Sequence, residues 1–157
     1  LEKIIFAGDI KISDSSFFKF NKCHFYGNVE LDEMKKFIFS NCHFYHKLEF
    51  NHNFEDGNFK GSVFYKDVNF SGLTFKRINF NNTKFYKVPN FEFTEFSTQI
   101  SLSKITIPKT KQAIEDIDNI DHIFLTDLEA KYRILKSMAI FSNDYEKELE
   151  FFSNELE

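Results

Sequence analysis

The sequence predicts a mainly β fold, a parallel β-helix of about four to five coils, followed by a C-terminal α-helical hairpin. Three observations predict it. Phenylalanine recurs every five or six residues along the middle of the chain, the pattern returns after some twenty residues, and helical spacing begins near residue 126. A strand repeats every two residues and a helix about every 3.6, so a spacing of five indicates a repeat architecture.

The five-residue spacing is clearest where the phenylalanines stand at Phe59, Phe64, Phe70, Phe75, Phe80, Phe85, Phe91 and Phe96. If these rings point inward, the residue two positions earlier lies on the same face of a short extended segment and is also buried. The earlier positions are small or apolar, at Gly57, Ser62, Val68, Leu73, Ile78, Thr83, Pro89 and Thr94. We therefore expect two inward side chains on each side of a four-sided coil.

Four columns of inward side chains follow from the twenty-residue period. We assign Phe20, Phe39, Phe59, Phe80 and Ile100 to the first column and Phe25, Phe44, Phe64, Phe85 and Ile105 to the second. The third contains Leu31, Phe50, Phe70 and Phe91, and the fourth contains Met34, Phe54, Phe75 and Phe96. The six-residue step always falls between the second and third columns, so the coils are in register. The spacing is poor over residues 32–36, where we expect a loop.

Segments such as Val68-Asn69-Phe70-Ser71-Gly72 and Ile78-Asn79-Phe80-Asn81-Asn82 resemble the pentapeptide-repeat family, with Phe in place of its usual central Leu. The resemblance covers residues 10–105 and implies a right-handed, four-sided β-helix. We place this pentapeptide-repeat solenoid at residues 1–107, a linker or short helix at 108–125, and a helical hairpin cap at 126–157. Weaker spacing at Ile5, Ile10 and Ile12 predicts an irregular first turn that covers the N-terminal end.

Charge and composition limit the kind of partner. The formal net charge is −4; residues 1–105 carry 14 Lys and Arg against 12 Asp and Glu, and residues 106–157 carry 6 against 12. Neither part has the basic surface of a nucleic-acid binder, so we expect none. Two cysteines do not make a secreted disulfide framework, which favours a reducing compartment and a cytoplasmic location. The chain begins with Leu1 and ends at Glu157 within a helical pattern, so we expect an excised fragment.

Two similar hexapeptides, at residues 21–26 and 40–45, each contain a Cys-His pair. Strand alternation sends Cys23 and Cys42 inward and His24 and His43 outward, so the four side chains do not converge on a metal ion. We expect both thiols to be reduced and no metal or cofactor to be bound.

One tyrosine follows each second-column phenylalanine, at Tyr26, Tyr45, Tyr65 and Tyr86. Stacked coils place these four side chains in an outward line, which we call the tyrosine ladder. Tyrosine offers a large amphipathic contact area, so the ladder is the candidate partner-binding site. The alternatives are that the rings only stack along a corner of the solenoid, or that the C-terminal helices pack across them.

The C-terminal part changes to helical spacing. The acidic run at residues 115–122 lacks the Gly and the closing Glu of a calcium loop, so we expect a short helix or linker. Thr126 and Glu129 form a capping box, ahead of an apolar face made of Leu128, Tyr132, Leu135 and Ala139. Asn143 with Glu146 is predicted to cap a second helix, whose apolar face is Tyr145, Leu149, Phe152 and Leu156. We expect both faces to dock on the last coil.

This tail also resembles a segment that follows pentapeptide repeats in bacterial membrane-anchored proteins, where transmembrane helices come next. The matching residues are Tyr132-Arg133-Ile134-Leu135-Lys136, Asn143-Asp144, Glu148-Leu149-Glu150-Phe151-Phe152 and Glu155. The resemblance implies a domain at the cytoplasmic face of the inner membrane in the full-length protein. It leaves membrane attachment through further segments, and self-association, open.

No sequence motif points to catalysis. The chain has no Gly-rich phosphate loop, no G-x-S-x-G and no H-E-x-x-H, and an interior filled by Phe leaves no cavity for a substrate. We expect a non-catalytic protein-interaction scaffold with a protein partner, as part of a larger membrane-tethered bacterial protein. The alternative is mimicry of duplex DNA to occupy a topoisomerase or other DNA-binding enzyme, which the family resemblance permits. The near-neutral repeat disfavours mimicry.

Overall fold

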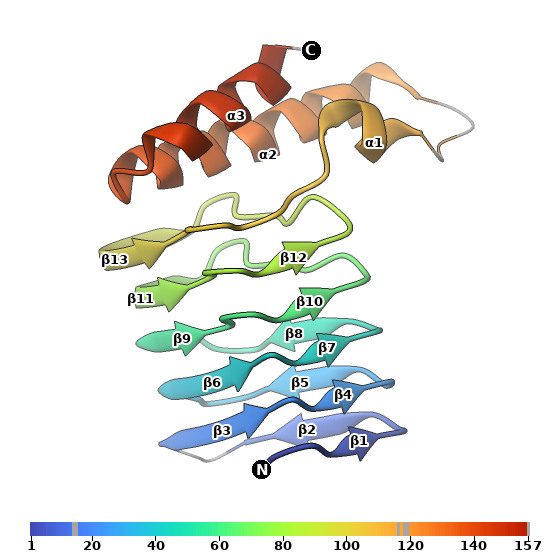
Figure 1. Cartoon of the computed structure of the whole chain (residues 1–157), viewed down its shortest axis with the longest axis vertical. Coiled ribbons are helices and arrows are strands. Elements are labelled where there is room, and N and C mark those ends of the chain that lie inside the picture. The colour runs from blue at the N-terminus through green and yellow to red at the C-terminus, as the bar shows by residue number, and fades with distance from the viewer. Residues whose placement is uncertain (14–15, 116, 118–119, 157) are drawn as a thin grey trace.

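The computed structural model describes residues 1–13, 16–115, 117 and 120–156, with backbone only for 155 and 156. It is a parallel β-solenoid of about five turns followed by helices at its C-terminal end (Figure 1). All ten strand pairings are parallel. The predicted β-helix is confirmed.

The strands of the solenoid form three sheets. The first runs β13 (Glu95–Ser101), β11 (Thr74–Asn79), β9 (Asp56–Asn58), β6 (Lys36–Ser40), β3 (Phe17–Asn21). The second runs β1 (Ile5–Phe6), β4 (His24–Phe25), β7 (His43–Phe44), β10 (Val63–Phe64), β12 (Lys84–Phe85). The third runs β2 (Ile10–Ile12), β5 (Val29–Leu31), β8 (Leu48–Phe50). The fourth expected side does not form a sheet of its own. Phe75 of the fourth column and Ile78, which leads into the first column, lie in the same strand, β11, and pair with Phe96 and Ile100 of β13.

Stacked phenylalanine rings fill the interior, as the spacing predicted. In the second column, the ring centroids of Phe44 and Phe64 lie 4.8 Å apart and those of Phe64 and Phe85 lie 4.9 Å apart. In the third column, Phe70 and Phe91 are 4.7 Å apart with an interplanar angle of 4°. Rings of different columns meet edge to face, so the core combines both favourable aromatic geometries.

Small polar side chains between the columns bond to the backbone. Ser62 and Thr83 are buried, and their hydroxyls donate to the carbonyl oxygens of Phe39 (2.8 Å) and Phe59 (2.9 Å). The hydroxyl of Thr94 donates to Phe70 O at 2.9 Å. These bonds satisfy the hydroxyls inside an apolar core, which explains why Ser and Thr are tolerated at inward positions.

The expected register of the last coil is wrong by two residues. Ile100 pairs with Ile78, and the N–H of Phe80 bonds to Ser101 O, so Leu102 continues the first column in place of Ile100. An isolated bridge joins Lys84 to Thr106, so the second column ends in Ile107, not Ile105. An irregularity in β13 opposite residues 75–77 shifts the pairing by one residue and accounts for one of the two. The other arises because Ile100 stands only four residues after Phe96, whereas the fourth and first columns are five residues apart in the earlier coils.

The first coil also differs from expectation. Residues 5–12 form β1 and β2, which are paired in register with β4 and β5. The N-terminal segment is therefore a regular coil and does not cover the end of the solenoid. Leu1, Ile5 and Phe17 are exposed there. At residues 32–35 the expected break between strands is present, although Met34 is buried in its assigned fourth column.

The coils turn at two corners through residues with left-handed backbone. Positive φ occurs two residues after the first-column side chains, at Lys22, Asn41, Gly61, Asn82 and Lys104, and after third-column side chains, at Glu33, Gly72 and Phe93. From Gly61 onward, the residue that follows each of these donates its N–H back to the column residue, as from Leu73 to Phe70 O at 3.2 Å. A turn with positive φ at its third position is type II, which favours Gly and Asn.

Phe93 is the costly member of this set, because φ is 56° and the ring is 88% exposed. A left-handed backbone costs a bulky residue roughly 1–2 kcal/mol, and an exposed ring recovers little of it. We expect Phe93→Asn to raise the melting temperature, since Asn tolerates this conformation. The matched change is Gly72→Ala at the equivalent turn, where φ is 69° and a Cβ meets nothing within 4 Å. Gly72→Ala should lower the melting temperature. If Phe93→Asn does not raise the melting temperature, the ring of Phe93 makes a stabilising contact.

Three helices follow the last coil: α1 (Thr110–Ile114), α2 (His122–Phe141) and α3 (Tyr145–Leu156). The capping box expected at Thr126 and Glu129 is wrong, because α2 begins four residues earlier with Asp121 accepting from Phe124 N at 2.8 Å. Within the acidic run at residues 115–122, residues 116, 118 and 119 lie outside the described part. Asn143 ends α2 with φ of 58°, and Asp144 is the residue that caps α3 by accepting from Lys147 N.

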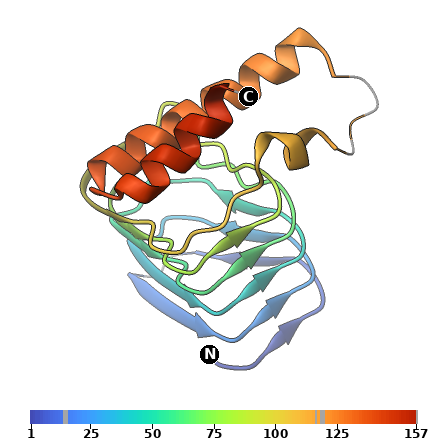
Figure 2. The ribbon, with the colours of Figure 1, turned by 45° about the horizontal axis from the view of Figure 1, so that its top comes forward.

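The inner face of α2 is as predicted and that of α3 is not. Leu128, Tyr132, Leu135 and Ala139 are all buried. On α3, however, Tyr145 and Leu149 are each 70% exposed and Phe152 is 45% exposed. Phe151 and Asn154 are buried instead. Figure 2 shows α2 and α3 lying side by side over the last coil, so the hairpin covers the C-terminal end of the Phe columns.

Candidate interaction surface

The tyrosine ladder forms as the sequence predicted. Its ring centroids are separated by 4.3 Å between Tyr26 and Tyr45, 4.6 Å between Tyr45 and Tyr65, and 5.0 Å between Tyr65 and Tyr86. The interplanar angles are 4°, 6° and 13°. Each ring follows a strand of the second sheet, whose in-register pairing sets this spacing.

A second stack of rings lies beside the ladder. The imidazoles of His24 and His43 are 4.6 Å apart and almost parallel. His24 Nδ1 lies 3.2 Å from the hydroxyl of Tyr45, and His43 Nδ1 lies 3.2 Å from that of Tyr65. Each histidine thus contacts the tyrosine one coil further along, and these bonds hold the middle rings in place.

The surroundings of Tyr45 and His43 favour the neutral form of each side chain. Partial burial in the stack, together with the hydroxyls of Tyr26 and Tyr65, raises the pKa of Tyr45 to about 12. Burial and then the neighbouring His24 lower the pKa of His43 below its usual value. At neutral pH the surface therefore presents phenol hydroxyls and an uncharged imidazole, which suit hydrogen bonding to polar groups of a partner.

A lysine side chain and a surface hollow lie at the C-terminal end of the ladder. Lys84 Nζ lies 4.2 Å above the Tyr86 ring and donates to its hydroxyl at 3.0 Å. Beyond it is a hollow of about 360 Å³, lined by Tyr86, Ile107 and Gln112 among others. Tyr86 is 46% exposed, so a side chain that enters this hollow meets an accessible aromatic face.

Among the described residues, the rings of the ladder stack on other tyrosines and on the two histidines, and Lys84 lies above the ring of Tyr86. Tyr26, at the other end, is also 46% exposed, and the two middle rings are half-buried between their neighbours. The helices lie over the end of the solenoid (Figure 1), where Phe141 packs on Phe96 at 4.9 Å. The interpretation that the helices pack across the ladder is therefore not supported.

Cys23 and Cys42 lie on the opposite face of their coils from the histidines. Both thiols are free and fully buried, as strand alternation predicted. Burial raises the pKa of Cys42 to about 12, so this thiol is protonated at neutral pH. Over the residues that are described, no group of three or more His, Cys, Asp or Glu side chains is placed to hold a metal ion.

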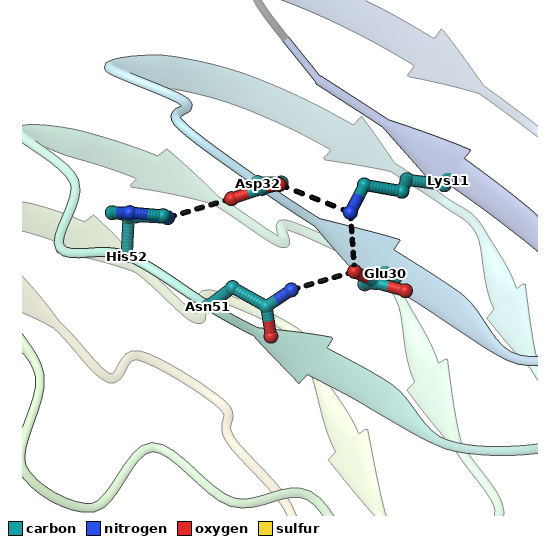
Figure 3. A network of polar contacts seen from close by, with 5 residues as sticks. All are labelled: Lys11, Glu30, Asp32, Asn51 and His52. Atoms are coloured by element: carbon teal, nitrogen blue, oxygen red, sulfur yellow. Dashed lines mark hydrogen bonds and ion pairs between the residues drawn. The ribbon is translucent and has the colours of Figure 1, made fainter.

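Charged residues on the third sheet form a cross-coil network, drawn in Figure 3. Lys11 Nζ lies 2.8 Å from Glu30 and 3.0 Å from Asp32, and His52 Nδ1 lies 2.6 Å from Asp32. The ammonium group of Lys11 holds the pKa of both carboxyls below their usual values. On the first sheet, Arg77 binds Asp56 through two nitrogens, at 2.6 and 2.7 Å. Stacked coils thus place cations next to carboxylates.

The sequence did not reveal two features of the structure. The hydrogen bonds between His24 and Tyr45 and between His43 and Tyr65 follow only from the stacking geometry. A groove between β13 and the turn from α2 to α3 depends on the irregularity in that strand and on where α2 turns into α3.

Within the described residues, no helix has the length and hydropathy needed to cross a membrane. Comparison with known proteins adds no identity, since no family model, characterised protein or solved structure matches the chain.

Proposed function

We propose that this chain is a pentapeptide-repeat solenoid that acts as a non-catalytic scaffold and binds a protein partner through the tyrosine ladder. The observation that carries the proposal is the line of four parallel rings along one edge of a rigid rod. The rings are fixed by stacking, so little side-chain entropy is lost when a partner covers them. Tyrosine is also enriched among the residues that dominate binding energy.

The surroundings of the ladder have the anatomy of a protein-binding patch. An apolar line of rings is bordered by the polar side chains of His24, His43, Lys66 and Lys87. Interfaces commonly combine an aromatic centre with a polar rim. The resemblance of the tail to segments that precede transmembrane helices extends the proposal to a scaffold within a membrane-tethered protein.

The charge distribution favours this function over DNA mimicry. A duplex mimic needs a continuous acidic face, whereas carboxylates of the coils lie beside Lys or Arg side chains of neighbouring coils. These pairs neutralise the charge locally.

The test is the loss of a captured partner on removal of ladder rings. We expect Tyr65→Ala and Tyr86→Ala each to weaken binding by about 1–2 kcal/mol or more, while the melting temperature changes little. The affinity for a protein captured with the full-length parent would be measured by calorimetry. Tyr145→Ala is the matched control, since it removes a 70% exposed ring on α3 away from the ladder. Equal losses for Tyr145→Ala and the ladder variants would argue against the proposal.

A further inference from the structure

The strand β13 has a free edge. Among the described residues, β13 is the last strand of its sheet and pairs with β11 on one side only. The carbonyl of Ser101 accepts from Phe80 N at 2.8 Å, so Ser101 faces β11. Successive residues of a strand direct their backbone groups to opposite sides, so Ile100 directs its N–H and C=O to the free edge. Such an edge is a template for an added strand.

A groove of about 640 Å³ runs along this edge. Thr98, Gln99 and Ser101 of β13 form one wall, and Asn143, Asp144 and Glu146 at the turn from α2 to α3 form the other. Thr98 and Gln99 are exposed. The groove therefore brings together unpaired strand backbone and a facing wall of polar side chains, as in proteins that bind peptides by strand addition.

The path of the chain leaves the next strand position open. In the second sheet, Thr106 bridges to Lys84 and so continues the stack by one more coil. Beyond Ile107 the chain leaves the solenoid to enter α1, and β13 remains the terminal strand of the first sheet (Figure 1). The helices are held instead by side chains such as Phe141, whose ring packs on Phe96.

The charge of the groove selects the chemistry of its occupant. The described residues that line it include two carboxylates, Asp144 and Glu146, and no Lys or Arg. Glu95 at the start of β13 is exposed as well. The chain from residue 106 onward carries 12 acidic against 6 basic residues, so the wider field has the same sign. An extended segment with Lys or Arg side chains complements this field.

We propose that the free edge of β13 binds an extended basic segment of a partner protein as an added strand, under the turn between α2 and α3. Backbone hydrogen bonds to the edge fix the segment, and its cationic side chains lie beside Asp144 and Glu146. This surface is distinct from the tyrosine ladder, and the inference stands whether or not the ladder binds a partner.

The test uses three fluorescein-labelled peptides, each as long as β13, and the whole chain. The first alternates Lys and Thr, the second has Glu in place of Lys, and the third is the first with N-methyl groups on alternate residues. By fluorescence polarisation we expect the first to bind, with an affinity that falls at high salt. The other two should bind at least about tenfold more weakly, because one has the wrong charge and the other lacks backbone donors.

Two charge reversals locate the site. Glu146→Lys should weaken binding of the Lys peptide about tenfold, whereas Glu49→Lys, at an exposed position of β8, should leave it unchanged. Amide resonances of residues 98–101 should shift on titration. Equal binding of the N-methylated peptide would overturn strand addition, and equal binding of the Glu peptide would overturn the charge argument. Absence of binding at millimolar peptide, or dimerisation through this edge in light scattering, would overturn the proposal.

Discussion

Replacing Phe70 with alanine should remove a large part of the stability of the solenoid. The ring is fully buried between Phe50 and Phe91, at centroid distances of 5.2 and 4.7 Å, and meets Phe59 and Phe80 edge to face. Truncating an enclosed Phe to Ala costs about 3–5 kcal/mol through lost transfer energy and an unfilled cavity. Stacked coils relax little, because each ring supports the next. Denaturant unfolding, followed by circular dichroism, measures the loss.

The neighbouring residue provides the control for this prediction. Asn69 is exposed, and its side-chain oxygen accepts from Ser71 N at 2.9 Å. Loss of one exposed hydrogen bond costs about 1 kcal/mol or less, so Asn69→Ala should change the midpoint only slightly. Similar losses for the two variants would contradict the assignment of inward and outward faces.

The sequence was sufficient for the coils because phenylalanine occupies most of the column positions. A ring at each fifth or sixth residue fixes the face of the strand, and the constant position of the longer step fixes the stacking. It was not sufficient for the last coil, where the pairing shifts between Phe75 and Arg77 and moves Leu102 and Ile107 into the columns. One extra residue in a strand leaves no mark in composition. The remaining residue of the error arises because no Phe marks the first column after Phe96 in this coil.

The face of α3 was assigned wrongly for a different reason. Tyr145, Leu149 and Phe152 recur at helical spacing, and periodicity alone favours them as the buried stripe. Polar contacts decide otherwise. The Oδ1 atom of Asn154 accepts from Thr110 N at 3.2 Å, and the hydroxyl of Thr110 donates to Asn154 O at 2.6 Å. These bonds fix the helix with Phe151 inward, and they join residues 44 positions apart, which no local pattern indicates.

The tyrosine ladder was predictable as geometry, because register alone places four side chains in line. Its exposure was not, because the sequence does not show where the helices dock. Because the helices lie over the end of the solenoid, they leave the ladder on the surface (Figure 1).

Removal of residues 122–157 should make the remaining solenoid self-associate. The deletion strips away Leu128, Leu135, Met138 and Phe151, which are all buried. It also removes the hydroxyl of Tyr132, which donates to Pro108 O where the chain leaves the last coil. Two kinds of surface are then open together, the apolar tops of the Phe columns and the backbone edge of the final strands. Exposed edges with apolar flanks pair with other chains, so we expect dimers or aggregates by light scattering.

Point variants show whether the buried contacts of the hairpin, rather than its mere presence, protect the end of the solenoid. Leu135→Ala, inside the contact, should destabilise the chain by about 2–5 kcal/mol. Leu149→Ala, on the outer face of α3 at 70% exposure, should leave both melting and mass unchanged. A deletion form that stays monomeric at high concentration would contradict the capping role. If the deletion form self-associates and the Leu149→Ala variant stays monomeric, the outer apolar face of α3 is not needed to keep the chain monomeric. Protection of the solenoid end then belongs to the inner face of the hairpin.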